Sequence, residues 1–317
     1  NHEDGREEMG GGPGGRSPGG VGGGPPLIPA LGSFVLDGYF RRKAAATLTG
    51  QARPFLQPTR GWGRVAAAAF AWAWAGFVLL IYGTLAAASV VRVWGYDWTL
   101  TWQHYRFEAV GVREALPTGL KLSGLAAVAG ALLSVVVAYV VHRLRPVGSQ
   151  LLYALAVLPA AVPGTVVGLG YLFAFNRPPV VLVGTATVIV LSYVFRFVTL
   201  GTLAASAALQ QVDRSVEEAA HSLGASAART FAQVVFPLLR VALFSSGVYI
   251  FVRSMVTLSA VIFLIAPGLE LPATAVLTLT TDGKLAAAAA LSTVLVGVIL
   301  FVVGTARLLL RVPVVLR

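Results

Sequence analysis

Long apolar runs separated by short polar or basic segments dominate the chain from about residue 65 onward. An α-helix rises 1.5 Å per residue, so roughly 20 apolar residues cross a hydrocarbon layer about 30 Å thick. Six runs of about this length occur, at residues 65–91, 122–141, 151–175, 180–198, 238–265 and 285–310. They lack the strict alternation of a membrane β-barrel strand. The pattern predicts an all-α fold, a polytopic transmembrane helix bundle of about six helices.

The overall composition is too apolar for a water-soluble globular protein, with 56% hydrophobic residues, 12% charged residues and a mean hydropathy of +0.78. The net charge of +11 does not indicate nucleic-acid binding, because the basic residues sit at the ends of the apolar runs. With no cysteine and four scattered histidines, neither a disulfide framework nor a resident metal site is expected. No cofactor is expected either.

The distribution of Lys and Arg predicts how the chain crosses the membrane. Fifteen of these residues fall on one side of the predicted spans, namely Arg41, Arg42, Lys43, Arg53, Arg60, Arg64, Arg143, Arg145, Arg196, Arg214, Arg229, Arg240, Arg307, Arg311 and Arg317. Six fall on the other side, namely Arg92, Arg106, Arg113, Lys121, Arg177 and Lys284. By the positive-inside rule, both termini and the polar segment 213–237 are expected in the cytoplasm.

The N-terminal region is predicted to be separate from the bundle. Its first 26 residues contain eleven glycines and four prolines, so residues 1–40 are expected to be a disordered Gly/Pro-rich segment. Residues 41–63 are predicted to form a basic cytoplasmic linker, and residues 64–311 the transmembrane domain. No signal peptide is predicted, because the first long apolar run begins only after about 60 residues. The start at Asn1 rather than Met indicates a piece of a longer polypeptide.

The polar segment 213–237 interrupts the apolar sequence with a helical pattern. Ser215 and Glu218 are spaced as in a capping box, in which two side chains satisfy unpaired amides at a helix start. Apolar residues recur at helical spacing at Val212, Val216, Ala219, Ala220 and Leu223, while Glu217 and His221 face elsewhere. Gly224 permits a positive φ, and Ser226 can cap a second helix that ends at Pro237. The segment predicts a helix-turn-helix, and the alternative is an amphipathic loop on the membrane surface in which Glu218 only caps.

This segment resembles the EAA loop of permease subunits of ATP-binding-cassette (ABC) importers. The pattern of that loop is Glu-Ala-Ala, three residues, Gly, nine residues, Ile, any residue, Leu and Pro. Its landmarks in this chain are Glu218, Ala219, Ala220, Gly224 and Pro237. Val234 and Phe236 replace the Ile and Leu of the family, apolar for apolar. The resemblance implies that segment 213–237 is a cytoplasmic coupling loop and that residues 64–311 form a permease domain.

The resemblance covers about residues 61–310, and its detail is similar to the ferric-iron branch of these permeases. Segments 163–171, 175–179, 251–255 and 259–264 carry that similarity. Phosphonate permeases, such as those for 2-aminoethylphosphonate-like substrates, and polyamine permeases resemble this branch closely. In the iron branch two six-helix halves are commonly fused, and residues 39–50 are similar to the linker between them. The resemblance therefore implies a C-terminal half, with ferric iron as substrate and phosphonate or polyamine as alternatives.

The resemblance also implies partners: a cytoplasmic ATP-binding subunit, a second permease half fused upstream or supplied as a dimer, a periplasmic or extracellular substrate-binding protein, and the lipid of a bacterial inner membrane. The chain has no Gly, four residues, Gly-Lys and Ser or Thr sequence that would cradle nucleotide phosphates. ATP hydrolysis is therefore expected on a partner, and this chain is not expected to be an enzyme.

Arg253 is predicted to be the only ionised side chain well inside a span, with Arg196 near the end of the fourth. A cation at a helix centre costs about 2.5–3.5 kcal/mol on insertion scales, so something should offset it. One interpretation is that Arg253 lines the transport pathway and meets an anion, such as an oxyanion that accompanies ferric ion, or a phosphonate. The alternatives are snorkelling to the outer surface and pairing with backbone carbonyls of the partner half.

Pro163, Gly164 and Gly168 stand out in the third predicted span. Proline breaks the helical hydrogen-bond ladder, and the spacing of Gly164 and Gly168 lets another helix approach closely. Helix packing is favoured over a gate hinge, because small residues at this spacing are common in membrane helices.

Two other classes of protein fit the sequence less well. An ion-coupled secondary transporter would place carboxylates near the bilayer midplane, and no acidic residue lies in a predicted span. An intramembrane enzyme would need a buried nucleophile with a base, or a metal cluster, and no such pair is found.

Overall fold

The computed structural model of the chain describes residues 61–107 and 111–310. The predicted Gly/Pro-rich segment 1–40 and nearly all of the predicted linker 41–63 lie outside the described residues, so these two boundaries remain predictions. Apart from residues 108–110 and 311, the predicted transmembrane domain 64–311 falls within the described residues.

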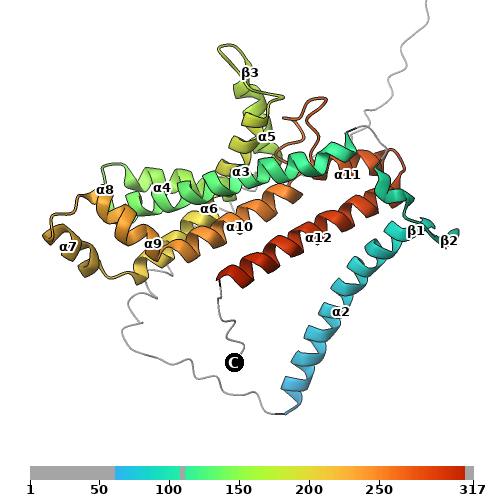
Figure 1. Ribbon diagram of the computed structural model, residues 1–317, viewed down its shortest axis with the longest axis horizontal. Coiled ribbons are helices and arrows are strands. Elements are labelled where there is room, and N and C mark those ends of the chain that lie inside the picture. Colours follow the sequence, from blue (N-terminus) through green and yellow to red (C-terminus); the bar gives the residue numbers. More distant parts are fainter. Residues whose placement is uncertain (1–60, 108–110, 311–317) are drawn as a thin grey trace, which may run out of the picture. The chain divides into compact units, whose positions relative to one another are not determined.

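The described residues are mostly helical (Figure 1). The helices are α2 (Trp62–Val90), α3 (Val112–Tyr139), α4 (Ser149–Val157), α5 (Gly164–Phe175), α6 (Ala186–Gln211), α7 (Arg214–Ser222), α8 (Ala227–Thr230), α9 (Phe236–Leu238), α10 (Arg240–Val256), α11 (Pro272–Thr281) and α12 (Leu285–Leu310). π-helical turns follow α3 (Val140–Leu144) and α8 (Phe231–Val235), and 3-10 turns occupy Gln103–Arg106 and Leu158–Ala160.

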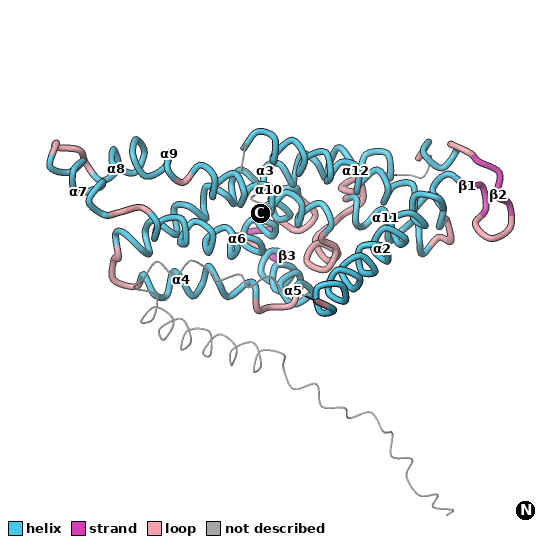
Figure 2. Tube along the Cα trace, turned by 90° about the horizontal axis from the view of Figure 1, so that it is seen from below, coloured by secondary structure: helices cyan, strands magenta, loops and turns pink. Residues whose placement is uncertain are grey.

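Two short antiparallel hairpins interrupt the helices. In the first, β1 (Val91–Val93) pairs with β2 (Asp97–Leu100), with Val91 opposite Leu100. In the second, β3 (Asn176–Arg177) pairs with β4 (Val180–Val181). The β1–β2 hairpin and α7 lie at opposite ends of the helices (Figures 1 and 2).

Length and composition make four helices candidate membrane spans, namely α2, α3 with its π-helical extension, α6 and α12. Two bent helix pairs bring the number to six if each pair is one span. One pair is Ser149–Ala160 with Gly164–Phe175, bent by 114°, and the other is Ala227–Leu238 with Arg240–Val256, bent by 71°. The prediction of a polytopic all-α bundle of about six spans is confirmed.

Three predicted spans differ from the structure in detail. The third, 151–175, is not one helix, because prolines 159 and 163 remove backbone donors and the chain turns between α4 and α5. The fourth begins at Ala186 rather than residue 180, because Pro178 and Pro179 place the preceding residues in a hairpin. The fifth ends at Val256, and the threonine-rich helix α11, which starts with proline at its first position, was missed.

The core lies between α3, α6 and α10, which pack against one another. Leu122 of α3, Tyr193 and Phe197 of α6 and Ile250 of α10 belong to one buried cluster. Small residues allow the close approach. A Cβ at Gly130 of α3, for example, would lie 2.8 Å from Cδ1 of Ile250. α12 packs on α2 and α11 beside this core.

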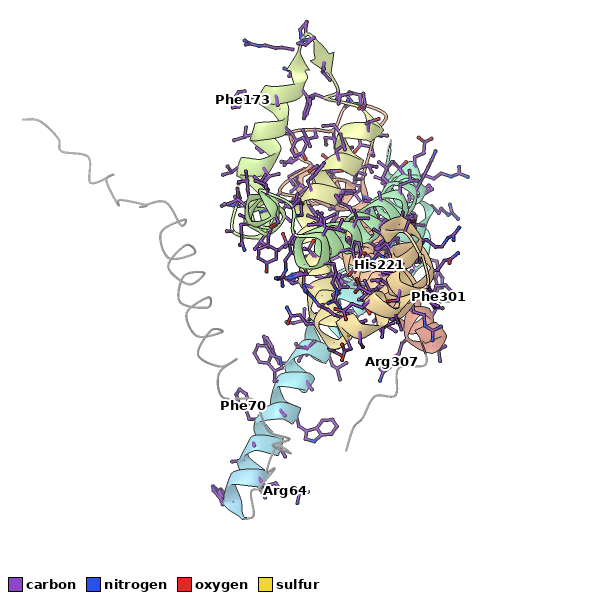
Figure 3. The ribbon with its side chains drawn as sticks, turned by 90° about the vertical axis from the view of Figure 1, so that its left-hand side faces the viewer. Arg64, Phe70, Phe173, His221, Phe301 and Arg307 are labelled. Carbon is purple, nitrogen blue, oxygen red and sulfur yellow. The ribbon has the colours of Figure 1, made fainter. Side chains whose placement is uncertain are left out.

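Much of the outer surface is apolar. Phe70 of α2, Phe173 of α5 and Phe301 of α12 are 74%, 78% and 71% exposed and point away from the packed helices (Figure 3). Large exposed apolar surfaces mark contact with a membrane or with another protein. The surface therefore fits a chain in contact with lipid or with other proteins.

Candidate coupling segment and membrane pathway

The segment 213–237, called the EAA segment below, joins α6 to α10 through two short helices. Asp213 is the N-cap of α7, and its Oδ1 accepts a hydrogen bond from the Ser215 backbone N–H at 2.9 Å. The predicted capping box starting at Ser215 is therefore wrong, because helix α7 begins one residue before Ser215. The Ser215 hydrogen bonds lower the pKa of the Asp213 carboxyl below its ordinary value.

The bend of the EAA segment lies at Gly224, whose φ of +83° is in the left-handed region. Ser226 then caps the second helical stretch by accepting from the Arg229 N–H at 3.4 Å. That stretch runs through α8 and the π-helical turn to α9, which contains Pro237. The predicted helix-turn-helix geometry is confirmed, and its role in coupling stays a prediction.

Helix α7 leaves most of its apolar positions uncovered. Val216 is 42% exposed and Leu223 is 88% exposed, and Glu218 and Ala219 are also exposed. Ala220 is partly covered. Glu217, expected to face elsewhere, is instead the buried residue of this helix at 9% exposure. The exposed surface of α7 therefore includes an apolar face, and Glu218 is exposed elsewhere on the same helix.

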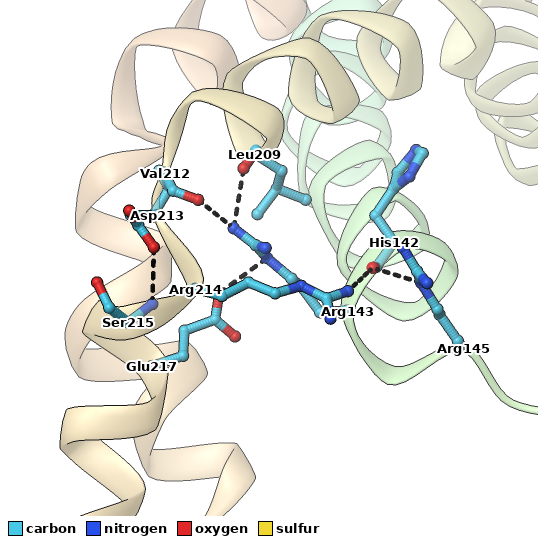
Figure 4. Close-up of polar contacts among 9 residues, drawn as sticks. All are labelled: His142, Arg143, Arg145, Leu209, Val212, Asp213, Arg214, Ser215 and Glu217. Carbon is cyan, nitrogen blue, oxygen red and sulfur yellow. Dashed lines mark hydrogen bonds and ion pairs between the residues drawn. The ribbon is translucent and has the colours of Figure 1, made fainter. Parts of the chain in front are cut away.

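Glu217 is buried because it meets Arg143, from the π-helical turn after α3 (Figure 4). Arg143 Nε lies 2.8 Å from Glu217 Oε1. Arg143 Nη2 also donates to the backbone carbonyls of Leu209 at 2.9 Å and Val212 at 2.6 Å. Arg143 thus contacts the end of α6, the residue after it and the first turns of α7.

A second arginine lies at the bend of the third span. Arg196 was expected near the end of its span, but it lies in the middle of α6, which continues to Gln211. Its Nη1 donates to the carbonyls of Pro159, at 2.8 Å, and Val162. Pro163 has no N–H, so the carbonyl of Pro159 has no helical partner four residues later. Arg196 satisfies that carbonyl and so holds the turn between α4 and α5.

Arg253, the predicted pathway residue, is exposed near the end of α10. Its guanidinium carbon lies 5.7 Å from the ring centroid of Phe197, the residue after Arg196 in α6. Arg196 and Arg253 are 15 and 13 residues from the ends of their helices at the EAA segment, or about 20 Å along the helix axis. The two arginines therefore lie at similar depth on adjacent helices.

Gly164 and Gly168 of α5 do allow a close approach, but not of another helix. A Cβ at Gly164 would lie 2.1 Å from Ser259 Oγ, and one at Gly168 would lie 2.6 Å from the Ala260 carbonyl oxygen. Both partners belong to the non-helical segment between α10 and α11. The glycines pack α5 against that segment, and a hinge at Pro163 stays a prediction.

The described acidic residues lie outside the middle of the long helices: Asp97 in a hairpin, Glu114 in the first turn of α3, Asp213, Glu217 and Glu218 in the EAA segment, Glu270 after α10, and Asp282 between α11 and α12. Within residues 61–107 and 111–310, no cluster of three or more His, Asp or Glu side chains could hold a metal. Beyond their first turns, α3, α6 and α10 carry the charged side chains Lys121, Arg196 and Arg253, all of them basic.

Sequence reasoning missed two of these contacts. For Arg196 a signal existed: an arginine within an apolar run, in the predicted span that follows a proline-containing span whose carbonyls need donors. For Arg143 and Glu217, a residue of the same charge lies close by in the sequence, Arg145 and Glu218 respectively, and only the folded chain selects which of them becomes buried.

The fold and the EAA segment define a polytopic membrane protein with a helical loop between spans. A sequence model of the family described as "Binding-protein-dependent transport system inner membrane component" matches residues 130–311, more than half of the chain. The chain belongs to this family: it is an inner-membrane permease component of an ABC transport system, and hence a transport subunit rather than an enzyme.

Relatives and a solved structure agree with this assignment. The chain is 36% identical over 235 residues to the ferric transport system permease protein FbpB of Actinobacillus pleuropneumoniae, covering 73% of this chain and 34% of that protein. It is 33% identical over 144 residues to a putative 2-aminoethylphosphonate permease protein, PhnV, of Salmonella paratyphi A, covering 45% of this chain and 54% of that protein. The chain spans about a third of the length of the FbpB relatives.

The fold is similar to that of a chain in the crystal structure of a bacterial ABC transporter that imports the polysaccharide alginate. The TM-score is 0.61 at 16% identity, over 78% of this chain and 96% of that chain. At this identity the similarity concerns the fold.

Proposed function

We propose that the EAA segment lies in the cytoplasm and docks onto a separate ATP-binding subunit, and that the chain supplies one half of the pathway. The observation that carries this proposal is the uncovered apolar face of α7 and its C-cap, which carries exposed Val216 and Leu223; Glu218 is exposed on the same helix. An amphipathic helix that leaves apolar side chains uncovered fits a groove on a partner protein. ATP-driven closure of the partner would then move α7 and shift the helices between inward-facing and outward-facing states.

We further propose ferric iron as the substrate, delivered by a substrate-binding protein on the opposite side of the membrane. The FbpB relatives, named for ferric transport, support this at 36% and 38% identity over longer alignments than the phosphonate relatives. Because those relatives are about twice as long as this chain, a second permease half is part of the proposal, fused or as a separate chain. A phosphonate or polyamine substrate is the alternative.

Arg253 is proposed to contact the passing substrate. It lies in the same membrane region as Arg196, where the described carboxylates are absent, so it favours a species that carries negative charge. A ferric ion accompanied by an oxyanion has this property, and so does a phosphonate. Uptake by an Arg253→Ala importer at or near the wild-type rate would refute this role.

Docking is tested by a matched pair of glycine variants in the assembled importer. Gly224 and Gly283 both have positive φ, +83° and +76°, and both have open space around a Cβ. Valine at either position is strained to a similar degree, on the order of 1–3 kcal/mol. Gly224→Val is expected to lose the co-purifying ATPase, whereas Gly283→Val, in the turn before α12, is expected to retain it. Equal recovery from both variants would refute docking through the EAA segment.

The substrate is tested in proteoliposomes that contain the full importer. Ferric-loaded binding protein is expected to stimulate ATP hydrolysis and uptake of radioactive iron, and phosphonate-loaded binding protein is expected not to. The reverse result would replace iron by phosphonate and leave the docking proposal intact.

A further inference from the structure

Arg143 spans the joint at which the membrane helix α6 passes into α7. Helix α6 ends at Gln211, and Val212 and Asp213 are both extended before α7 begins at Arg214. Arg143 contacts Leu209 and Val212 on one side of this joint and Glu217 on the other (Figure 4). Because Arg143 itself belongs to the extension of α3, three helices meet at this single side chain.

The chemistry of each contact suits a guanidinium. The last carbonyls of an α-helix have no partner within the helix, and they carry partial negative charge. Arg143 Nη2 donates to the carbonyl of Val212 and to that of Leu209, which also accepts from the Val212 N–H, while Nε faces the Glu217 carboxylate. A planar fork with five donors can hold acceptors in two directions, which an ammonium group cannot do with the same geometry.

The contact between Arg143 and Glu217 is buried, so its loss is costly. The side chains of Arg143 and Glu217 are only 10% and 11% exposed. Removing one partner of a buried pair leaves the other charge without compensation, which is much worse than losing a surface pair. Arg143 Nε and Glu217 Oε1 are close, but the N–H is not aligned with the oxygen, so this contact is an ion pair, while the two carbonyl contacts of Nη2 are hydrogen bonds.

We propose that Arg143 is a positioning residue that fixes the angle between α6 and α7, so that movement of the EAA segment reaches α6 and α3 instead of being absorbed at residues 212 and 213. The proposal rests on the proposed docking of the EAA segment on an ATPase. Docking alone is then insufficient to transmit the movement, because the connection between α6 and α7 must also be rigid. Glu217, which the EAA pattern does not include, then acts within the chain, while the exposed Glu218 is left for the partner.

The test measures coupling and joint stiffness separately in the complete importer. The variants are Arg143→Gln and Glu217→Gln, and the matched control is Arg145→Gln, an exposed arginine two residues away. The chain has no cysteine, so single cysteines at Val147, beyond the end of α3, and at Ser222 of α7 can carry spin labels. Double electron–electron resonance gives the distance distribution between them, and proteoliposomes give the substrate taken up per ATP hydrolysed.

Arg143→Gln is expected to keep the co-purified ATPase, to broaden the spin-label distance distribution and to lower uptake per ATP about fivefold or more, the low end of ordinary coupling between sites. Arg145→Gln is expected to resemble wild type in all three. If Arg143→Gln fails to assemble, Glu217→Gln, which removes one contact and keeps the side-chain shape, provides the test. Wild-type uptake per ATP and an unchanged distribution in the assembled variant would overturn the proposal.

The charge-swapped double variant, Arg143→Glu with Glu217→Arg, tests whether Arg143 acts through the ion pair alone or also through its two carbonyl contacts. A carboxylate at position 143 would face the carbonyl oxygens of Leu209 and Val212, so the swap is expected not to restore uptake per ATP. Full restoration would refute a role of these carbonyls. Loss of the ATPase from the wild-type complex, or its retention by Gly224→Val, would instead refute docking, so the two proposals fail by different results.

Discussion

Adding one methyl group to Gly168 is expected to disturb the contact between α5 and the segment that follows α10. The new Cβ would lie 2.6 Å from the Ala260 carbonyl oxygen and 3.2 Å from its carbonyl carbon. Carbon–oxygen contacts between neighbouring chains are ordinarily about 3.3–3.6 Å, so the two segments must separate by roughly 0.7 Å. Ala260 and Val261 are fully buried, and backbone hydrogen bonds tie Val261 and Leu264 into their turn.

The magnitude follows from comparison with Gly170→Ala in the same helix, where a Cβ meets nothing within 4 Å. Replacing glycine by alanine inside a helix stabilises by about 0.5–1 kcal/mol in both variants, so this effect cancels. Overpacking costs about 1–3 kcal/mol and affects Gly168→Ala alone. For a domain of this size 1 kcal/mol shifts Tm by about 2–4 °C, so Gly168→Ala is expected to melt about 2–12 °C below Gly170→Ala.

The assay is thermal unfolding of the assembled importer in one detergent, with iron uptake measured in parallel. Gly168→Ala is expected to lower Tm and uptake, and Gly170→Ala is expected to change neither for the worse. Equal melting temperatures for the two variants would refute the idea that α5 packs tightly on residues 259–263.

Three further predictions concern the cap of α7, the bend of the third span and the core. The Ser215 hydrogen bonds lower the pKa of Asp213, so the cap stabilises α7 fully at pH values above the ordinary carboxyl pKa of 3.8. This stabilisation is lost as the pH falls from 3.8 through the lowered pKa. Hydrogen exchange of α7 should show the loss in wild type and not in Asp213→Asn. Arg196→Met should lower the unfolding free energy by about 1.5–3 kcal/mol for each carbonyl left unpaired, and an unchanged Tm would contradict the contact to the bend. Gly201→Ala should destabilise through its clash with Ser134, 2.8 Å from Cβ to Cβ, and adding Ser134→Gly should recover the loss, whereas simple additivity would argue against the contact.

Much of the fold could be predicted because membrane spans depend on local composition. α2 and α12 lie close to the apolar runs that predicted them, and α3 contains most of its run but begins at Val112, ten residues before it. The break between α4 and α5 was harder, because Pro159 and Pro163 lie in an uninterrupted apolar run, and hydropathy does not register a missing N–H. α11 was missed because its threonines lower the hydropathy while their hydroxyls bond to the helix backbone.

The EAA segment was predictable in outline because its two helices and its glycine bend are local features. Its orientation was not. Helical spacing placed Glu217 away from the apolar face, but the side that becomes buried depends on Arg143, which is 74 positions earlier in the sequence. For Arg196, the predicted span ended too early, and a correct boundary at Gln211 would have placed this arginine mid-helix.

The continuity of α6 gives the molecule a stiff rod between its two arginine contacts. One end of this helix is held by Arg143, and Arg196, about 22 Å away along the same axis, holds the carbonyls at the α4–α5 turn. A rotation imposed at the end of α6 beside the EAA segment would therefore reach the turn without passing through a proline or a loop. We expect rotation of this one helix, more than displacement of the whole bundle, to transmit movement from one side of the membrane to the other.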